Sequence, residues 1–151
     1  MQLTQKETEL LKDLKNQEKL CAEKYEKYSG EAADPQLKNL FSQIAGVERG
    51  HLNTLTQIEN GSAPPAGGSG GTAQPTFTAA YSIADTEDKK HDCFLCSDLL
   101  TMEKHASHLY DTCVFEFTQQ ELRNTLNAIQ KEEQNHGKMI YDYMSKNSMY
   151  G

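Results

Sequence analysis

Two Glu-x-x-His motifs stand eighty-five residues apart in this chain of 151 residues. The first joins Glu48 to His51, and the second joins Glu133 to His136. Residues three apart lie on one face of an α-helix, so each glutamate can converge with its histidine on one point. Carboxylate oxygen and imidazole nitrogen are common metal ligands, and each motif therefore predicts part of a metal site.

Each motif is preceded by a glutamate at a distance of thirty residues, and that glutamate is followed by a tyrosine seven residues later. The first copy has Glu18 and Tyr25, and the second has Glu103 and Tyr110. Five further identical pairs keep the same offset: Leu14/Leu99, Lys19/Lys104, Leu37/Leu122, Asn39/Asn124 and Ile44/Ile129. This recurrence indicates an internal duplication.

The two copies together supply four carboxylates and two imidazoles: Glu18, Glu48, His51, Glu103, Glu133 and His136. One glutamate from each of two helices, with Glu-x-x-His from each of the other two, is the ligand set of a carboxylate-bridged two-metal site in a helical bundle. Oxygen-rich ligation with one imidazole per metal suits iron or manganese better than structural zinc. Two alternatives stay open: charged helices usually turn such side chains to water, and the pattern also suits a structural site without turnover.

Apolar residues recur at helical spacing in four long segments, which predicts an all-α four-helix bundle made of two helical hairpins. We expect a single domain over 1–151, with one hairpin at about 4–60 and the other at about 85–146. Thr4-Gln5-Lys6-Glu7 and Thr118-Gln119-Gln120-Glu121 have the form of capping boxes. Asp34-Pro35 is a typical helix start, and Asn60-Gly61 is a plausible helix end.

Residues 61–84 form the predicted linker between the hairpins, and the run from Pro64 to Gly71 is plainly non-helical. At up to about 3.3 Å per residue the linker can run the length of a helix. It can therefore join two parallel helices as a long crossover. Phe77 and Tyr81 are expected to hold it on the bundle surface.

The charge balance is acidic, with 22 Asp and Glu against 15 Lys and Arg, a net charge of −7. This argues against nucleic acid as a partner. No apolar run reaches the roughly 18 to 20 residues that span a bilayer, which argues against a membrane protein. The first residues lack an apolar signal-peptide core, so we expect a cytoplasmic protein with reduced cysteines.

The cysteines allow two interpretations. Cys21, Cys96 and Cys113 fall on or near the predicted core stripes, where cysteine behaves as a small buried apolar residue. Alternatively, Cys93 and Cys96 form a redox pair or an accessory metal site, with Cys21 close to the main metals. The remaining histidines are expected at the surface: His91, His105 and His108.

The duplicated motifs resemble the ferritin-like di-iron superfamily, especially its rubrerythrin-type members. That resemblance implies a ferritin-like bundle, two iron ions (or manganese) held by the six residues above, and Tyr25 and Tyr110 as hydrogen-bonding partners of ligand carboxylates. It also implies a non-haem oxidoreductase acting on O2 or peroxide, or a protein that handles iron, and a homodimer by analogy. Rubrerythrins carry an extra glutamate where this chain has Ala106, and two Cys-x-x-Cys pairs where it has one, so electrons are expected from an external donor.

The C-terminal half resembles a second family, the Coat F family of spore coat proteins, which has the ferritin-like fold. The matching stretches are Glu103-Lys104-His105, Leu122-Arg123-Asn124-Thr125-Leu126, Glu132-Glu133 and Tyr141-Asp142-Tyr143-Met144. This resemblance implies an alternative function, a structural or coat-associated protein of the spore coat whose partners are other coat proteins. The metal is then either stabilising or vestigial.

Overall fold

Four helices make up the protein in a computed structural model that describes residues 2–62 and 74–150. They are α1 (Gln5–Glu31), α2 (Pro35–Glu59), α3 (Glu87–Glu116) and α4 (Gln120–Lys146). The described ranges contain no strand. The predicted all-α bundle of two hairpins is confirmed. None of these helices is long and apolar enough to cross a membrane.

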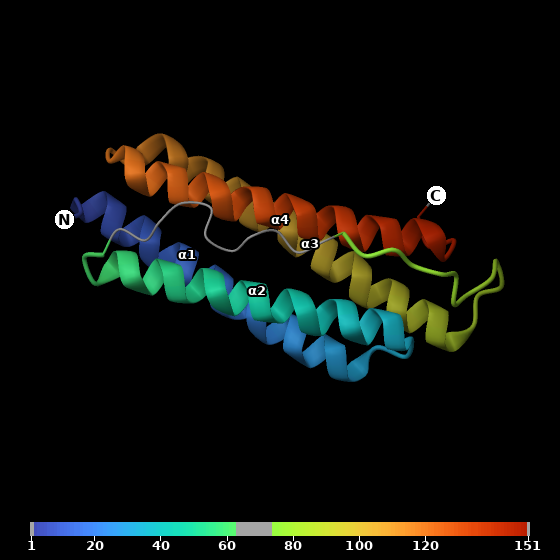
Figure 1. The fold of residues 1–151 in the computed structure, drawn as a ribbon. Helices are drawn as coiled ribbons and strands as arrows, with labels where there is room; N and C mark the ends of the chain where they lie inside the picture. The colour runs from blue at the N-terminus through green and yellow to red at the C-terminus, as the bar shows by residue number, and fades with distance from the viewer. Residues whose placement is uncertain (1, 63–73, 151) are drawn as a thin grey trace.

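Helices α1 and α2 form one antiparallel hairpin, and α3 and α4 form the other (Figure 1). Helices α2 and α3 run in the same direction along the bundle, so the end of α2 and the start of α3 lie at opposite ends of it (Figure 1). The expected crossover between parallel helices is therefore present. The predicted non-helical run from Pro64 to Gly71 lies outside the described residues.

Helix starts in the first hairpin follow local capping chemistry. The Thr4 hydroxyl accepts a hydrogen bond from the Glu7 backbone N–H at 3.1 Å, and the Glu7 carboxylate accepts one from the Thr4 backbone at 2.8 Å. This is the predicted capping box. Asp34 accepts from the backbone N–H of Gln36 at the start of α2, directly before Pro35.

The second predicted capping box is wrong. Helix α4 begins at Gln120 after Gln119, which makes no side-chain cap. Thr118 instead donates its backbone N–H and its hydroxyl to the Glu7 carboxylate, at 2.9 and 3.2 Å. The Glu7 carboxylate thus accepts the Thr118 N–H that the Glu121 carboxylate would accept in a capping box, so a tertiary contact replaces the local cap.

Side chains near the C-terminal end of the linker hold it on the bundle, as predicted. The Phe77 ring packs edge-on against Tyr143, with ring centroids 5.3 Å apart. The Tyr81 hydroxyl donates to the buried carboxylate of Asp92 at 2.6 Å. The side-chain oxygen of Asn147 accepts from the Tyr81 backbone at 3.0 Å. The linker is thus held against α3 and α4 at Phe77 and Tyr81.

The apolar core consists of two separate clusters. One contains Tyr25, Phe41 and Leu99, and the other contains Leu14 and Ile58. Each fully buried side chain of this kind contributes about 1.5–3 kcal/mol to folding. In each helix the glutamates of the duplicated motifs fall between the residues of the two clusters in sequence. The bundle therefore carries a polar layer between two apolar ones.

Candidate metal centre

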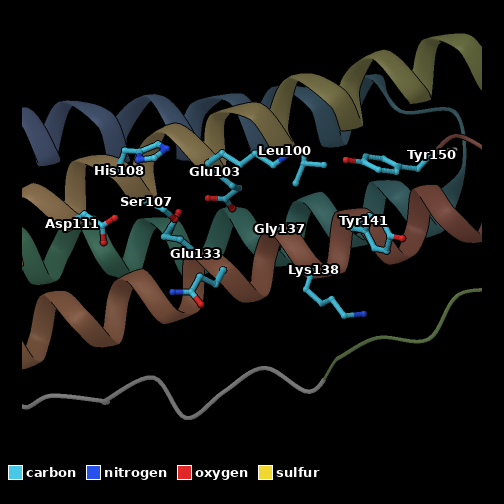
Figure 2. Close-up of a pocket in the computed structure, with 12 residues that line it drawn as sticks. Leu100, Glu103, Ser107, His108, Asp111, Glu133, Gly137, Lys138, Tyr141 and Tyr150 are labelled. Carbon is cyan, nitrogen blue, oxygen red and sulfur yellow. The ribbon is translucent and has the colours of Figure 1, made fainter.

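All six predicted ligands lie in this polar layer, and each is at most 4% exposed. Helix α1 supplies Glu18, and α3 supplies Glu103. Helices α2 and α4 each supply one Glu-x-x-His pair. Figure 2 shows the α3–α4 side of this layer, with Glu103 and Glu133 labelled. The duplication thus brings one ligand-bearing turn from every helix to the same level of the bundle.

The six side chains form two overlapping groups of four. One group is Glu18, Glu48, His51 and Glu133, and the other is Glu48, Glu103, Glu133 and His136. Within each group, one ligand atom per residue lies within 4.8 Å of all the others. Glu48 and Glu133 belong to both groups, so their carboxylates lie where they can bridge two ions. Glu18 and Glu103 belong to one group each, so each could hold only one of two ions.

Both imidazoles turn their Nδ1 atoms towards the carboxylates. His51 Nδ1 lies 2.8 Å from Glu133 Oε1, although these residues come from different hairpins. His136 Nδ1 lies 3.0 Å from Glu48 Oε1 and 3.1 Å from Glu103 Oε2. The two rings are stacked with centroids 6.2 Å apart. The histidines therefore connect the two hairpins across the centre of the bundle.

Seven buried side-chain polar atoms form no hydrogen bond of good geometry within the described part of the chain, although three of them lie within 3.0 Å of a neighbouring imidazole or carboxylate atom. They belong to five of the six residues: Glu18, Glu48, His51, Glu103 and Glu133. A buried polar atom without a partner costs roughly 1–3 kcal/mol, and more when it is charged. A cation bound between these atoms would use their lone pairs. The cluster is therefore compatible with metal binding, and its oxygen-rich donors suit iron or manganese.

Burial and mutual repulsion make the ionised forms of the carboxylates in this layer unfavourable. Burial raises the pKa of Glu48 and of Glu133 well above the ordinary value, and the neighbouring carboxylates of Glu18 and Glu103 add to the shift. Burial acts to lower the pKa of His51, but the carboxylates of Glu132 and Glu133 beside its ring raise it overall. The layer holds four carboxyl groups and two imidazoles, so the imidazoles alone cannot neutralise four ionised carboxylates.

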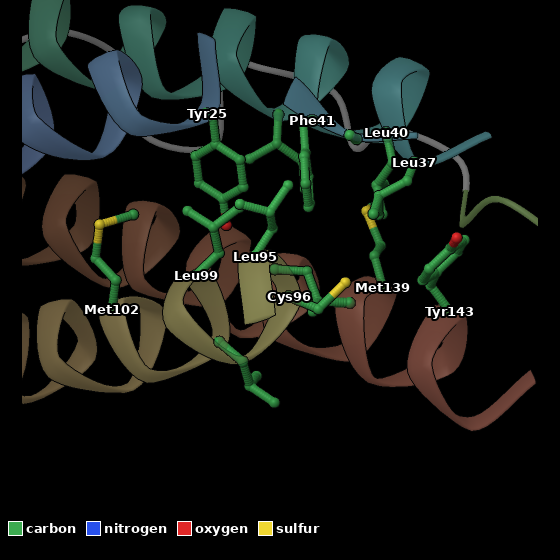
Figure 3. Close-up of a cluster of buried hydrophobic side chains, with 14 of the residues drawn as sticks. Tyr25, Leu37, Leu40, Phe41, Leu95, Cys96, Leu99, Met102, Met139 and Tyr143 are labelled. Atoms are coloured by element: carbon green, nitrogen blue, oxygen red, sulfur yellow. The ribbon is translucent and has the colours of Figure 1, made fainter. Parts of the chain in front are cut away.

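Two buried tyrosines donate hydrogen bonds to the carboxylates of Glu103 and Glu18, and each bond crosses between the hairpins. The Tyr25 hydroxyl donates to Glu103 at 2.8 Å, and the Tyr110 hydroxyl donates to Glu18 at 2.6 Å. The Tyr25 ring also packs in the apolar cluster that contains Phe41 (Figure 3). The tyrosine of each copy therefore orients a glutamate of the other copy. The spacing of residues along one helix does not predict these tyrosine–glutamate pairs.

Glu132 is a residue of the site that sequence reasoning missed. Its Oε1 atom lies 3.2 Å from Nε2 of His51, the ring nitrogen that faces away from the carboxylate cluster. Such a contact fixes the orientation of an imidazole and raises its basicity. The clue in the sequence was an acidic residue next to Glu133 where the first copy has Val47. The two halves of the centre are therefore unequal.

The cysteines match the apolar interpretation. Cys21, Cys96 and Cys113 are buried, and all four cysteines are free. Burial raises the pKa of Cys113 to about 12, and it raises the pKa of Cys21 with a further contribution from Glu48 and Glu18. In the described ranges no candidate metal cluster includes Cys93 or Cys96. The remaining histidines are exposed, as expected: His91, His105 and His108.

These features can be compared with known proteins. Residues 91–151 match the Coat F domain. The matched segment covers most of α3 and all of α4, and it includes Glu103, Glu133 and His136. No curated protein and no solved structure matches the chain. The Coat F segment therefore holds most of one hairpin and three of the six residues of the cluster.

Proposed function

We propose that this chain is a ferritin-like di-metal carboxylate protein that uses two iron ions, with manganese as the alternative metal. The observation that carries the proposal is the pair of four-residue groups that share Glu48 and Glu133. The buried polar atoms that lack good hydrogen bonds in these residues support it, because buried polar atoms that bind no ligand normally have hydrogen-bond partners within the protein. The ferritin-like assignment rests on the duplicated motifs and on the four-helix architecture.

The protein side chains have distinct roles in this proposal. Glu18 and Glu103 would each hold one ion, Glu48 and Glu133 would bridge, and His51 and His136 would each supply one nitrogen. Tyr25 and Tyr110 would keep the carboxylates of Glu103 and Glu18 oriented, and the apolar clusters flank the layer on its two sides. When bound, an iron pair supplies the electron transfer by which O2 or peroxide is reduced. We propose that an external donor returns the electrons.

Oxidation kinetics test this function. Metal-free protein is given iron(II) without oxygen and then mixed with peroxide or O2, and the absorbance of the oxidised iron is followed. We expect the wild type to oxidise iron(II) faster than buffer, and the Glu48→Ala/Glu133→Ala variant to match buffer. The control, Glu59→Ala/Glu121→Ala, removes exposed glutamates from the same two helices and should behave as wild type. Equal rates in all three proteins would refute the function.

A spore coat role is the second candidate, and the Coat F match favours it. In this role the bundle is an assembly unit that binds other coat proteins, and the metal stabilises it or has been lost. Mass spectrometry of purified, extracted spores tests this role, which predicts the chain in the coat fraction. Its absence from spores, or an organism that forms none, would exclude the role.

A further inference from the structure

A cavity of about 470 Å³ lies between α3 and α4 and borders one half of the proposed metal centre (Figure 2). Its wall includes Leu100, Glu103, Ser107, Glu133, Gly137 and Tyr141. Small-molecule sites in proteins have volumes of roughly 300–1,000 Å³, so this space is of ligand size. Glu103 is 2% exposed, and its Oε1 atom lacks a hydrogen-bond partner. A buried unpaired ligand atom therefore belongs to a residue of the cavity wall.

The internal duplication provides a comparison for this cavity. The position of Gly137 is held by Leu52 in the first hairpin, and the position of Ser107 is held by Ala22. Leu52 is half-buried and Ala22 is fully buried. The equivalent face of the first hairpin is also bridged by Arg49, whose guanidinium lies 2.7 Å from Glu26. The second hairpin thus has a smaller residue at Gly137 than the first has at Leu52, whereas Ser107 is no smaller than Ala22.

Gly137 has no packing requirement that would explain a glycine in this helix. A Cβ atom added there would lie 3.6 Å from the nearest Leu100 carbon, which is an ordinary van der Waals contact. Glycine in a helix interior costs roughly 0.5–1 kcal/mol relative to alanine. Gly137 and Leu100 both line the cavity, so a larger side chain at position 137 would take up space beside Leu100.

We propose that this cavity is the small-molecule site of the metal centre, and that it serves only the Glu103–His136 half. The inference rests on the proposed di-metal function. The molecule that fits is a small anion with a metal-ligating oxygen or nitrogen at one end and an apolar body at the other. Glu103 and Glu133 border the ligating end, while Leu100 and Tyr141 provide apolar surface. A space of about 150 Å³ is enough for benzene, so the cavity exceeds the needs of peroxide alone.

Ligand binding to iron-loaded protein tests the proposal, with azide as the spectroscopic probe and benzoate as its competitor. Gly137→Leu fills the cavity with the side chain found in the first copy. Gly50→Leu is the matched control, because it makes the same change at an exposed site in α2 with no atom within 4 Å of the new Cβ. All three proteins should hold the same amount of iron. Gly137→Leu should weaken azide and benzoate binding at least roughly ten-fold, and Gly50→Leu should change it by less than about two-fold. Unchanged binding in Gly137→Leu would overturn the inference and leave the proposed function standing.

A second measurement uses metal-free protein and therefore separates the two proposals. Thiols introduced by Ser107→Cys and by Ala22→Cys, at equivalent positions of the two copies, are treated with a small methanethiosulfonate reagent and located by peptide mass spectrometry. The Ser107→Cys thiol should react at least roughly ten-fold faster, and adding Gly137→Leu should slow it, because a filled cavity excludes the reagent. Equal rates at the two positions would overturn the open cavity whatever the iron content. A wild type that binds no iron would overturn the proposed function, and the labelling rates would then decide the cavity alone.

Discussion

At the scale of single residues, the centre is organised by hydrogen bonds that cross between the duplicated halves. Tyr110 donates to Glu18 at 2.6 Å, and both side chains are fully buried. The spacing of the sequence predicted the six clustered residues and both tyrosines, because helical periodicity places i, i+3 and i+7 on one face. It did not predict which carboxylate each tyrosine contacts, and it missed Glu132, since these contacts depend on how α1 packs with α3 and α2 with α4.

Replacing Tyr110 with phenylalanine should destabilise the protein by about 1–3 kcal/mol. The substitution keeps the ring but leaves a carboxylate oxygen of Glu18 without a donor in a buried site. Urea unfolding followed by circular dichroism measures the change. Tyr141→Phe is the control, because Tyr141 is 41% exposed, and it should change stability by less than about 0.5 kcal/mol. Equal stability of the two variants would contradict the proposed importance of the Tyr110–Glu18 bond.

At the scale of helices, apolar periodicity and end signals predicted all four elements. The starts of α1 and α2 follow local chemistry at Thr4 and Asp34, which a sequence shows directly. The start of α4 does not, because Thr118 bonds to Glu7 more than a hundred residues earlier in the chain. Glu7 therefore caps α1 and also fixes the α3–α4 connection to it, so one carboxylate joins the two hairpins at this end of the bundle.

Replacing Glu7 with glutamine should lower stability by about 1–2 kcal/mol at neutral pH. Burial acts to raise the pKa of Glu7, but hydrogen bonds from Thr4 and Thr118 hold it below its ordinary value of 4.5. A lowered pKa in the folded state means that the carboxylate stabilises the fold above about pH 4.5 and loses this effect as the pH falls through the folded-state value.

The difference in unfolding free energy between wild type and Glu7→Gln should accordingly shrink below pH 4.5. Urea titrations at several pH values measure it. Glu9→Gln, which changes an exposed glutamate of the same helix, should show little difference at any pH. A gap between wild type and Glu7→Gln that persists or widens in acid would contradict this account of the contact.

At the scale of the whole molecule, two apolar clusters enclose a layer of four carboxylates and two imidazoles. The sequence predicted this architecture through its duplication, because an eighty-five-residue offset places matching turns at one level once the hairpins pack. The copies differ in sequence at Gly137 and Glu132, but only the packed structure shows that Gly137 borders a cavity and that Glu132 contacts His51. The molecule tolerates a concentration of buried charge that folding alone disfavours.

Neutralising the bridging positions should stabilise the metal-free protein. Glu48→Gln/Glu133→Gln keeps the side-chain shapes while replacing two buried carboxyl groups whose ionisation is opposed by burial and by Glu18 and Glu103. We expect a gain of about 1–4 kcal/mol in urea unfolding, since replacing buried charge by neutral groups is often stabilising. The same variant should not be stabilised by added iron(II). A loss of stability in the metal-free variant would indicate that the carboxylates are held by protein contacts alone.

The central claim, a two-metal centre between the hairpins, is tested most directly by the metal content of protein purified without added metal. Elemental analysis should find about two iron or manganese ions per chain, and close to none in the Glu48→Ala/Glu133→Ala variant. A metal-free wild type whose melting temperature does not change on addition of iron(II) would contradict the claim.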